Sequence, residues 1–414
     1  MIRCPRGTRD FLPDEMERRR HYENVLRTVA GTFGFREIAT PIFEEASLFV
    51  IKSGPNILDE IYAFKDKGDR DLALRPELTA PVVRMFVNGM SNEPRPLKLF
   101  YFGQCFRYER PQSGRYREFF QFGAEMIGNA NAETDAEAIA LAVSMIKALG
   151  LRKYKIRIGH IGILRNMLAE ANVPQDGMQE ILQKLDKKMY DEAGSLLRSA
   201  GVCDDSVKRI FETAGTTGGK EVLDKITDDA AAYMKEVMEI LEAMNVTDAE
   251  IDLGVVRGLD YYTGMVFEAE APSLGAEKQI CGGGSYSLSE LFGGEKVFST
   301  GFAIGFDRIL LAMEKEGQTF RNKGVDAYVV PVSDDVRLEA VKIASMLRSR
   351  GIVTDIDIMR RKMAKAMKHA ASAGARYAVI IGKSELEENS VTVRNMETGD
   401  QRMIRLDELF GLFL

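Results

Sequence analysis

Apolar residues recur at helical spacing in some stretches of the chain and alternate with polar residues in others. A stretch from Pro13 to about Phe33 carries its apolar residues on one helical face, which predicts a helix. Residues 36–39 read as a short strand. Further along, Thr134 or Asp135 is placed to cap a helix that ends before a glycine. The first third of the chain therefore mixes helices with strands.

The second half divides into three patterns. Residues 161–245 are almost wholly helical and look like an insertion between two β-rich stretches. Strands and glycines return over residues 251–316, ending in a predicted helix at 303–316, and residues 321–324 read as a linker. Beyond the linker, strands alternate with helices, which indicates an α/β domain of about 90 residues. Its predicted elements are strands 327–332, 352–356, 377–381, 391–394 and 402–405, helices 334–350 and 359–373, and a short last helix.

Composition narrows the classes of function. The 414 residues are 45% hydrophobic and 29% charged with a net charge of −6, so any nucleic-acid contact must come from local basic patches. The four cysteines are scattered, and neither they nor the three histidines form a metal-binding or disulfide pattern. The N-terminal residues lack an apolar segment, and no run of 18 apolar residues occurs. We therefore expect a cytoplasmic protein that neither spans nor binds a membrane and has no metal site of its own.

Residues 97–127 predict a long antiparallel hairpin whose turn is the polar stretch 110–115. Side chains two apart on a strand share a face, and one face of residues 118–126 is plainly core. The other face and the incoming strand place chemistry-bearing residues together: Cys105, Arg107, Glu109, Phe119, Gln121, Gly123 and Glu125. The alternative is a solvated sheet face with cross-strand ion pairs, but the aromatic ring and the glycine favour a ligand-binding surface.

Three glycine-rich segments add candidates. Residues 257–264 combine an arginine, two tyrosines and two glycines, residues 282–286 form a weaker glycine run, and residues 300–310 place Arg308 on an apolar segment. A buried arginine needs an anionic partner, either a carboxylate of the protein or a nucleotide phosphate. A basic run lies at residues 360–368. It is either a solvated helix face or a contact for a phosphate backbone.

Together these segments resemble the class II aminoacyl-tRNA synthetases and, within them, the histidyl-tRNA synthetase family. The class resemblance lies in residues 38–44 (motif 1), 106–125 (motif 2) and 301–308 (motif 3). The histidine-specific resemblance lies in residues 6–10, 75–81 and 257–262. One departure occurs, because Ser285-Tyr286-Ser287 stands where the family usually has Arg-Tyr-Asp.

The resemblance implies an α+β class II catalytic core, an antiparallel sheet flanked by helices, with a helical insertion and a C-terminal α/β anticodon-binding domain. The division it implies is residues 1–160 for the first part of the core, 161–248 for the insertion, 249–320 for the second part of the core and 325–414 for the anticodon-binding domain.

The implied activity is that of a histidine–tRNA ligase. Histidine and ATP, with Mg²⁺, would give histidyl-adenylate and pyrophosphate, and histidine would then pass to the 3′ end of tRNA(His) with release of AMP. The implied assembly is a homodimer, with the insertion on the acceptor stem and the last domain on the GUG anticodon. Two alternatives stay open: a catalytically silent paralogue such as the regulatory subunit of ATP phosphoribosyltransferase, and a synthetase for another amino acid.

The family's site residues carry over by position. Arg107 and Arg257 would flank the α-phosphate, with Arg107 also on the amino-acid carboxylate, and Arg308 would bind the γ-phosphate. Phe119 would stack on adenine and Glu109 would accept from its amino group. Histidine would be held through its α-amino group and the rest of its pocket by Glu77, Thr79, Gln121 and Glu125, and on its imidazole side by Tyr261 and Tyr262. The tRNA acceptor end would meet Gln112, Arg115 and Arg117.

Overall fold

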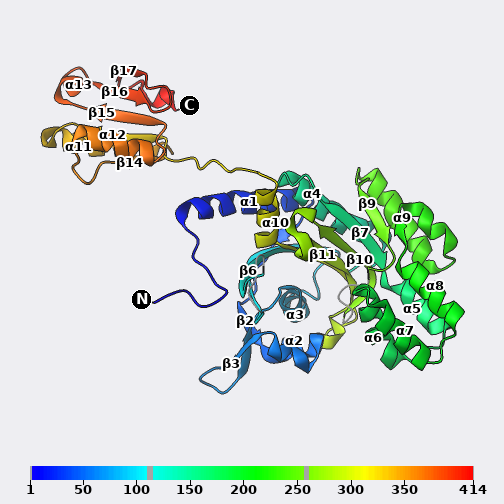
Figure 1. Cartoon of the computed structure of the whole chain (residues 1–414). Helices are drawn as coiled ribbons and strands as arrows, with labels where there is room; N and C mark the ends of the chain where they lie inside the picture. The colour runs from blue at the N-terminus through cyan, green and yellow to red at the C-terminus, as the bar shows by residue number, and fades with distance from the viewer. Residues whose placement is uncertain (1, 110–114, 256–260, 414) are drawn as a thin grey trace. The chain divides into compact units, whose positions relative to one another are not determined.

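The computed structural model describes residues 2–109, 115–255 and 261–413 (Figure 1). The chain forms two compact units, Met1–Thr319 and Phe320–Leu414. The predicted linker at 321–324 lies just after this division. The finer four-part division stays a prediction.

A nine-stranded sheet organises the first unit, in the order β1-β5-β6-β12-β11-β10-β7-β9-β8. Its centre, from β5 to β7, is antiparallel. Towards the two edges, β1 pairs in parallel with β5 and β9 in parallel with β7, and β8 is antiparallel to β9. The strands are β1 Arg36–Glu37, β5 Leu97–Phe106, β6 Glu118–Ile127, β7 Lys155–His160, β8 Thr217–Gly218, β9 Ala249–Asp252, β10 Tyr262–Glu270, β11 Gln279–Tyr286 and β12 Ser299–Gly305. The predicted hairpin is confirmed as β5 and β6.

Helices α1 (Pro13–Thr32), α4 (Ala132–Ala148) and α10 (Phe306–Lys315) share a large apolar core with one face of this sheet. The other face packs against α3 (Thr79–Gly89) through a smaller core. Phe122, Ala124 and Met126 of β6 are buried in the large core, as their alternation predicts. The opposite residues of β6 are thereby turned towards the α3 side.

Two predicted boundaries in this unit are wrong. The cap of α4 is Asn131, whose side chain accepts from the Thr134 amide at 3.0 Å, so Thr134 and Asp135 lie inside the first turn. The helix predicted from residue 303 begins at Phe306, because residues 303–305 still pair with β6 as part of β12. The first error overlooks a local capping residue that stands earlier in the chain, and the second comes from strand pairing that a local pattern does not show.

A small three-stranded sheet and two helical turns, which the sequence pattern did not reveal, stand beside α3. The elements are β2 Phe43–Glu45, α2 Ala46–Ser53, η1 Pro55–Asp59, β3 Tyr62–Lys65 and β4 Asp71–Leu74. Strands of three or four residues are too short for alternation to be visible in the sequence.

The stretch 161–245 is mostly helical, as predicted, although it also contains the short strand β8 at Thr217–Gly218. Helices α5 to α8 enclose an apolar core of their own, whereas α9 packs against α4, which covers one face of the large sheet. The elements are α5 Ile161–Glu170, α6 Gln175–Asp186, α7 Tyr190–Ser199, α8 Asp204–Ala214, η2 Lys220–Lys225 and α9 Asp229–Ala243. Helix α9 thus lies at the boundary of the insertion.

The second unit is the predicted α/β domain, with sheet order β14-β13-β15-β16-β17. The first three strands are parallel and the last two antiparallel. Helix α12 begins at Met363 rather than at residue 359. The elements are β13 Ala327–Pro331, α11 Arg337–Ser349, β14 Thr354–Ile356, α12 Met363–Ser372, β15 Tyr377–Ile381, α13 Lys383–Glu387, β16 Ser390–Asn395 and β17 Gln401–Arg405.

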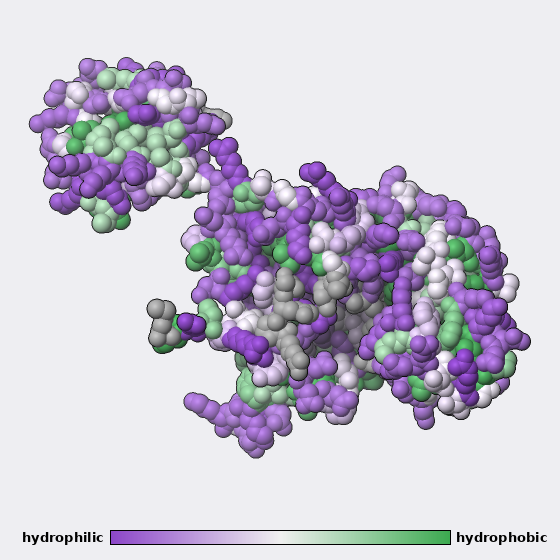
Figure 2. Space-filling view, in the orientation of Figure 1, coloured by the Kyte–Doolittle hydropathy of each residue, from purple (hydrophilic) through white to green (hydrophobic). Residues whose placement is uncertain are grey.

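Hydrophilic residues dominate the visible surface of both units (Figure 2). None of the helices in the described ranges is long and apolar enough to cross a membrane.

Candidate active site

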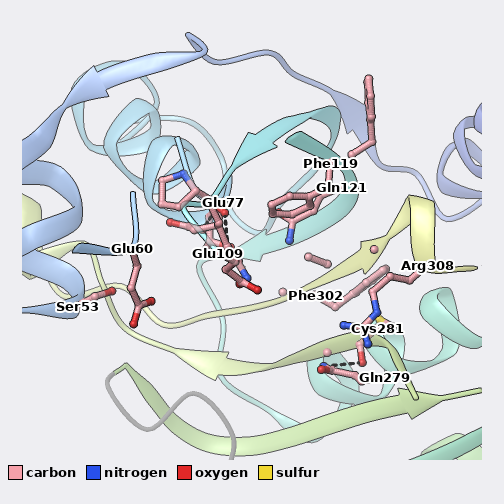
Figure 3. A pocket seen from close by; sticks show the side chains of 18 of the residues that line it. Ser53, Glu60, Glu77, Glu109, Phe119, Gln121, Gln279, Cys281, Phe302 and Arg308 are labelled. Carbon is pink, nitrogen blue, oxygen red and sulfur yellow. Dashed lines mark hydrogen bonds between the residues drawn. The ribbon is translucent and has the colours of Figure 1, made fainter. Parts of the chain in front are cut away.

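A pocket of about 490 Å³ opens on the α3 side of the large sheet (Figure 3). Most of the residues that the sequence nominated line it: Glu77, Thr79, Arg107, Glu109, Arg115, Phe119, Gln121, Glu125, Tyr261, Tyr262 and Arg308. Arg117 does not. Arg257 and Gln112 lie outside the described residues.

Glu125 is the most deeply buried acid of the pocket, with 1% of its surface exposed. Its Oε1 accepts from the Thr79 hydroxyl at 2.9 Å and from the Tyr101 hydroxyl at 3.0 Å. Its Oε2 accepts from the Tyr286 hydroxyl at 2.6 Å. Burial raises the pKa of Glu125 to about 7, although these three hydrogen bonds favour the charged form. Within the described ranges, no lysine or arginine forms an ion pair with it.

Two glycines make room for this carboxylate. Gly301 of β12 lies opposite Glu125, and a Cβ atom there would stand 1.6 Å from Oε2. Gly123 lies opposite Tyr101, and a Cβ atom there would stand 2.3 Å from the Tyr101 hydroxyl. The expectation that Gly123 admits a ligand is therefore refined. Its missing side chain lets Tyr101 cross the strand to reach Glu125.

Glu77 has a different environment from Glu125, although both line the same pocket. It accepts from the Thr79 amide at 2.6 Å and the Ala80 amide at 3.1 Å, and so satisfies the first turn of α3. It also pairs with Lys52 of α2 at 3.1 Å, and the Lys52 ammonium lies 4.4 Å from the Tyr261 ring centre. Lys52 is thus a buried cation of the site that sequence reasoning missed.

Arg107 is fixed just past the end of β5. Its Nε donates to the Pro76 carbonyl at 3.0 Å, and its guanidinium carbon lies 5.2 Å from the Phe119 ring centre. Among the described carboxylates, none pairs with it. Arg308, on the first turn of α10, lies across the pocket from Glu77 in the view of Figure 3. The pocket therefore has arginines on two parts of its wall, with Arg107 beside the segment that carries Glu77 and Arg308 across the cavity from it.

The three residues expected at the tRNA acceptor end do not share one environment. Arg115 lines the pocket, is partly exposed and pairs with Glu109 at 3.3 Å. Arg117 instead donates its Nε to the Glu109 carbonyl at 3.1 Å and lies over the Tyr108 ring. Arg117 therefore holds the base of the hairpin loop, which is a structural use of its charge.

Asp307, which the sequence did not nominate, lies next to Arg308 at the pocket edge and is buried. It pairs with Arg9 and, at 2.7 Å, with Arg19, and it accepts from the Phe120 amide at 2.7 Å. These contacts join the N-terminal segment, α1, β6 and α10. Residues 6–10 therefore contribute to the packing of the first unit through Arg9, whose guanidinium stands 3.8 Å from the Tyr116 ring centre.

Cys105 lies on the predicted face but is buried, with its sulfur 3.3 Å from the Gln121 side-chain oxygen. Burial raises the pKa of its thiol to about 12. It acts as a small core residue beneath Gln121. The sequence analysis also missed Tyr286 and Tyr101 as partners of Glu125. Tyr286 follows the glycine run and Tyr101 stands two residues before Gly103, and neither position by itself indicates a site residue.

Comparison with known proteins gives one consistent result. The family model described as "Histidyl-tRNA synthetase" matches residues 7–309, and that described as "Anticodon binding domain" matches residues 326–414. The histidine–tRNA ligase of Archaeoglobus fulgidus is 46% identical, covering 99% of both chains. The structure of apo histidyl-tRNA synthetase from S. aureus is 32% identical, covers both chains fully and has a TM-score of 0.76. A Bacillus halodurans structure titled an ATP phosphoribosyltransferase regulatory subunit/histidyl-tRNA synthetase is 26% identical, with a TM-score of 0.79 and coverage of 92% and 98%.

Proposed function

The chain belongs to the histidyl-tRNA synthetase family, and from this premise we propose how its residues perform the reaction. Its activity is that of a histidine–tRNA ligase, which joins histidine to tRNA at the expense of ATP. The observation that carries the residue assignment is the arrangement of charge in the pocket. A buried carboxylate that has no ion-pairing cation among the described residues lies among tyrosines, and Arg107 and Arg308 line other parts of the wall.

Glu125 is the acceptor for an imidazole N–H. It lies deepest, and Tyr286, which binds it, stands edge-on to Tyr261 with ring centres 5.9 Å apart. Glu77, Thr79 and Gln121 receive the α-amino group nearer the mouth. A site whose buried polar groups need a ring N–H rejects apolar side chains of similar shape, because the unmet partners are costly.

Arg107 and Arg308 bind the phosphates of ATP, with Arg257 assigned to the α-phosphate by family resemblance alone. The histidine carboxylate attacks the α-phosphorus in line and pyrophosphate leaves. Both reactants are anionic, so fixed cations and positioning supply most of the catalysis and no general base is required. Phe119 and Glu109 bind the adenine. Held by Pro76, Arg107 is fixed before the substrates arrive.

Mg²⁺ would neutralise charge on the leaving pyrophosphate. Within the described ranges, no group of three His, Cys, Asp or Glu side chains could hold an ion. Mg²⁺ prefers phosphate oxygens and water with few protein ligands. The nucleotide phosphates would therefore be its main ligands here.

Histidine-dependent exchange of pyrophosphate into ATP tests this assignment. We expect exchange with histidine alone among the amino acids, and its loss in Arg257→Ala. Adenylate formation with proline or threonine instead would contradict the specificity. If a folded wild-type dimer gave no exchange with any amino acid, the regulatory-paralogue alternative would replace this proposal.

The second unit carries a surface suited to RNA, which we name the α12 surface: Ile358, Met359, Arg360, Lys362, Lys365 and Lys368. Ile358 and Met359 are 78% and 67% exposed. Arg361 forms an ion pair with Asp357 at 2.6 Å. No described carboxylate pairs with the four cations of the α12 surface. Unpaired cations next to exposed apolar side chains can bind phosphates and stack on unpaired bases of the anticodon loop.

Lys362→Ala/Lys365→Ala tests the α12 surface. We expect unchanged pyrophosphate exchange, a KM for tRNA raised about tenfold in aminoacylation, and a weaker salt dependence. The matched control is Lys342→Ala on α11, where the lysine already pairs with Glu339. Equal KM values for tRNA in the two variants would show that the α12 surface does not bind tRNA.

In the first unit, Arg115 is assigned to the tRNA acceptor end.

We also propose a homodimer. Ile42, Phe43 and Phe64 of the small sheet region are exposed apolar residues, and Ile42 and Phe43 fall in the motif 1 segment. Burying them against a second copy would remove an apolar patch from water. Sedimentation should give twice the chain mass, and an active monomer would contradict this.

A further inference from the structure

A second buried carboxylate lies behind the sheet, on the side away from the pocket. Asp135 of α4 has 1% of its surface exposed. Both of its oxygens accept from the Ser285 hydroxyl at 2.8 Å, Oδ1 also accepts from Thr300, and Oδ2 accepts from the Tyr233 hydroxyl at 2.7 Å. Among the described residues, no lysine or arginine pairs with it. We name these four residues the Asp135 clamp.

Asp135 accepts hydrogen bonds from two neighbouring strands at directly opposed positions. Ser285 of β11 and Thr300 of β12 are register partners. The next residue on each strand points to the other face, towards the pocket. On β11 this residue is Tyr286, which donates to Glu125. On β12 it is Gly301, whose missing side chain leaves room for the Glu125 carboxylate.

Fixing Ser285 and Thr300 from behind therefore fixes Tyr286 and Gly301 in front. The Tyr286 hydroxyl lies 2.6 Å from Glu125, so a small displacement of β11 would change the length of this bond. A displacement of β12 would change the room that Gly301 leaves for the Glu125 carboxylate. Among the residues that the structure describes, only hydroxyls bind the Asp135 carboxylate, so each of the three partners matters. A buried carboxylate that loses a donor is costly.

The third donor, Tyr233, belongs to α9 at the boundary of the helical insertion. Its ring also stands edge-on to His160, at the end of β7, with centres 5.8 Å apart. The clamp thus joins the insertion, α4 and the two pocket strands through one carboxylate.

We propose that the Asp135 clamp is a positioning group for histidine recognition, which sets the imidazole end of the pocket from behind the sheet. It rests on the proposed function, because its effect is defined on the binding of histidine. None of its four members is among the residues that line the pocket.

The test compares KM for histidine and KM for ATP in pyrophosphate exchange. The variants are Ser285→Ala, Thr300→Val, Thr300→Ser and Tyr233→Phe, with Asp135→Asn added if it folds. The matched control is Thr392→Val in the second unit, which removes a buried hydroxyl that donates to Glu385 at 3.0 Å. Melting temperatures are measured alongside.

We expect Ser285→Ala and Thr300→Val to raise KM for histidine about tenfold, with KM for ATP changed less than about twofold and a smaller rise in Tyr233→Phe. Thr300→Ser, which keeps the hydroxyl, should restore wild-type KM. Unchanged KM for histidine, or equal changes in both KM values, would overturn the proposal. Failure of the wild type to exchange with histidine would instead overturn the proposed function, so the two failures are distinct.

Discussion

Glu125 and Asp307 are both buried carboxylates that line one pocket, yet their charges are balanced in opposite ways. Asp307 is neutralised by Arg9 and Arg19. Glu125 is held by three neutral hydroxyls and has no cation of its own among the described residues. The ion pairs of Asp307 join separate parts of the chain, whereas the Glu125 carboxylate remains able to bind a ligand N–H.

This difference in charge balance distinguishes a carboxylate that stabilises the fold from one that binds a ligand. An ion pair in the interior is complete without substrate, and breaking it leaves unpaired charge. A carboxylate that is hydrogen-bonded but lacks a cation is costly in the empty protein, and a ligand N–H relieves that cost. Glu77, which pairs with Lys52, is intermediate between the two.

The largest effect should come from Glu125→Gln. Histidine-dependent exchange should fall in kcat/KM by about 10³-fold, because the ring N–H loses its acceptor in a desolvated site. Stability at pH 8 should not fall. Steady-state exchange and urea unfolding measure both, and a variant that loses stability while keeping its activity would reverse the comparison.

Asp307→Asn should lower the stability of the protein rather than its recognition of histidine. It leaves two arginines facing a neutral group, which should cost roughly 3–5 kcal/mol of unfolding free energy. The matched control is Glu314→Gln, since Glu314 forms an exposed pair with Arg18 at 3.6 Å and should cost under about 0.5 kcal/mol. Equal unfolding free energies for the two variants would contradict a structural role for Asp307.

The pH dependence of stability should distinguish Glu125 as well. Its pKa is about 7 in the folded state against an ordinary value near 4.5, so the folded state binds more protons between these values. The free energy of unfolding should therefore fall as pH rises from about 4.5 to 7, by up to roughly 3 kcal/mol relative to Glu125→Gln. Chemical unfolding at pH 5 and pH 8 measures this, and parallel curves would contradict it.

The smallest effect should come from Tyr286→Phe. Removing one donor to the charged form should raise the pKa of Glu125 further and raise KM for histidine about fivefold. KM for ATP should stay unchanged. An equal rise for both substrates would show a general distortion of the pocket.

The comparison also shows what the sequence could predict. Alternation along β6 placed Phe119, Gln121 and Glu125 on one face, because the side-chain period of a strand is local information. The partners of Glu125 could not be predicted in this way. Tyr101 and Tyr286 reach it from other strands, and only the strand register brings them there.

The same limit explains the other misses. Lys52 and Arg19 look like ordinary surface cations of helices, and their acids lie just before α3 and on α10. Asp135 was read as a helix cap because it stands near a helix start. Its hydroxyl donors come from β11, β12 and α9, far away in the chain.

Binding calorimetry of histidine and of β-(4-thiazolyl)alanine, whose ring has sulfur in place of N–H, tests the central claim most directly. The wild type should bind histidine at least about 100-fold more tightly, and in Glu125→Gln this ratio should shrink to within about tenfold. The coupling would assign the ring N–H to Glu125. An unchanged ratio in the variant would show that the cation-free carboxylate is not the group that recognises histidine.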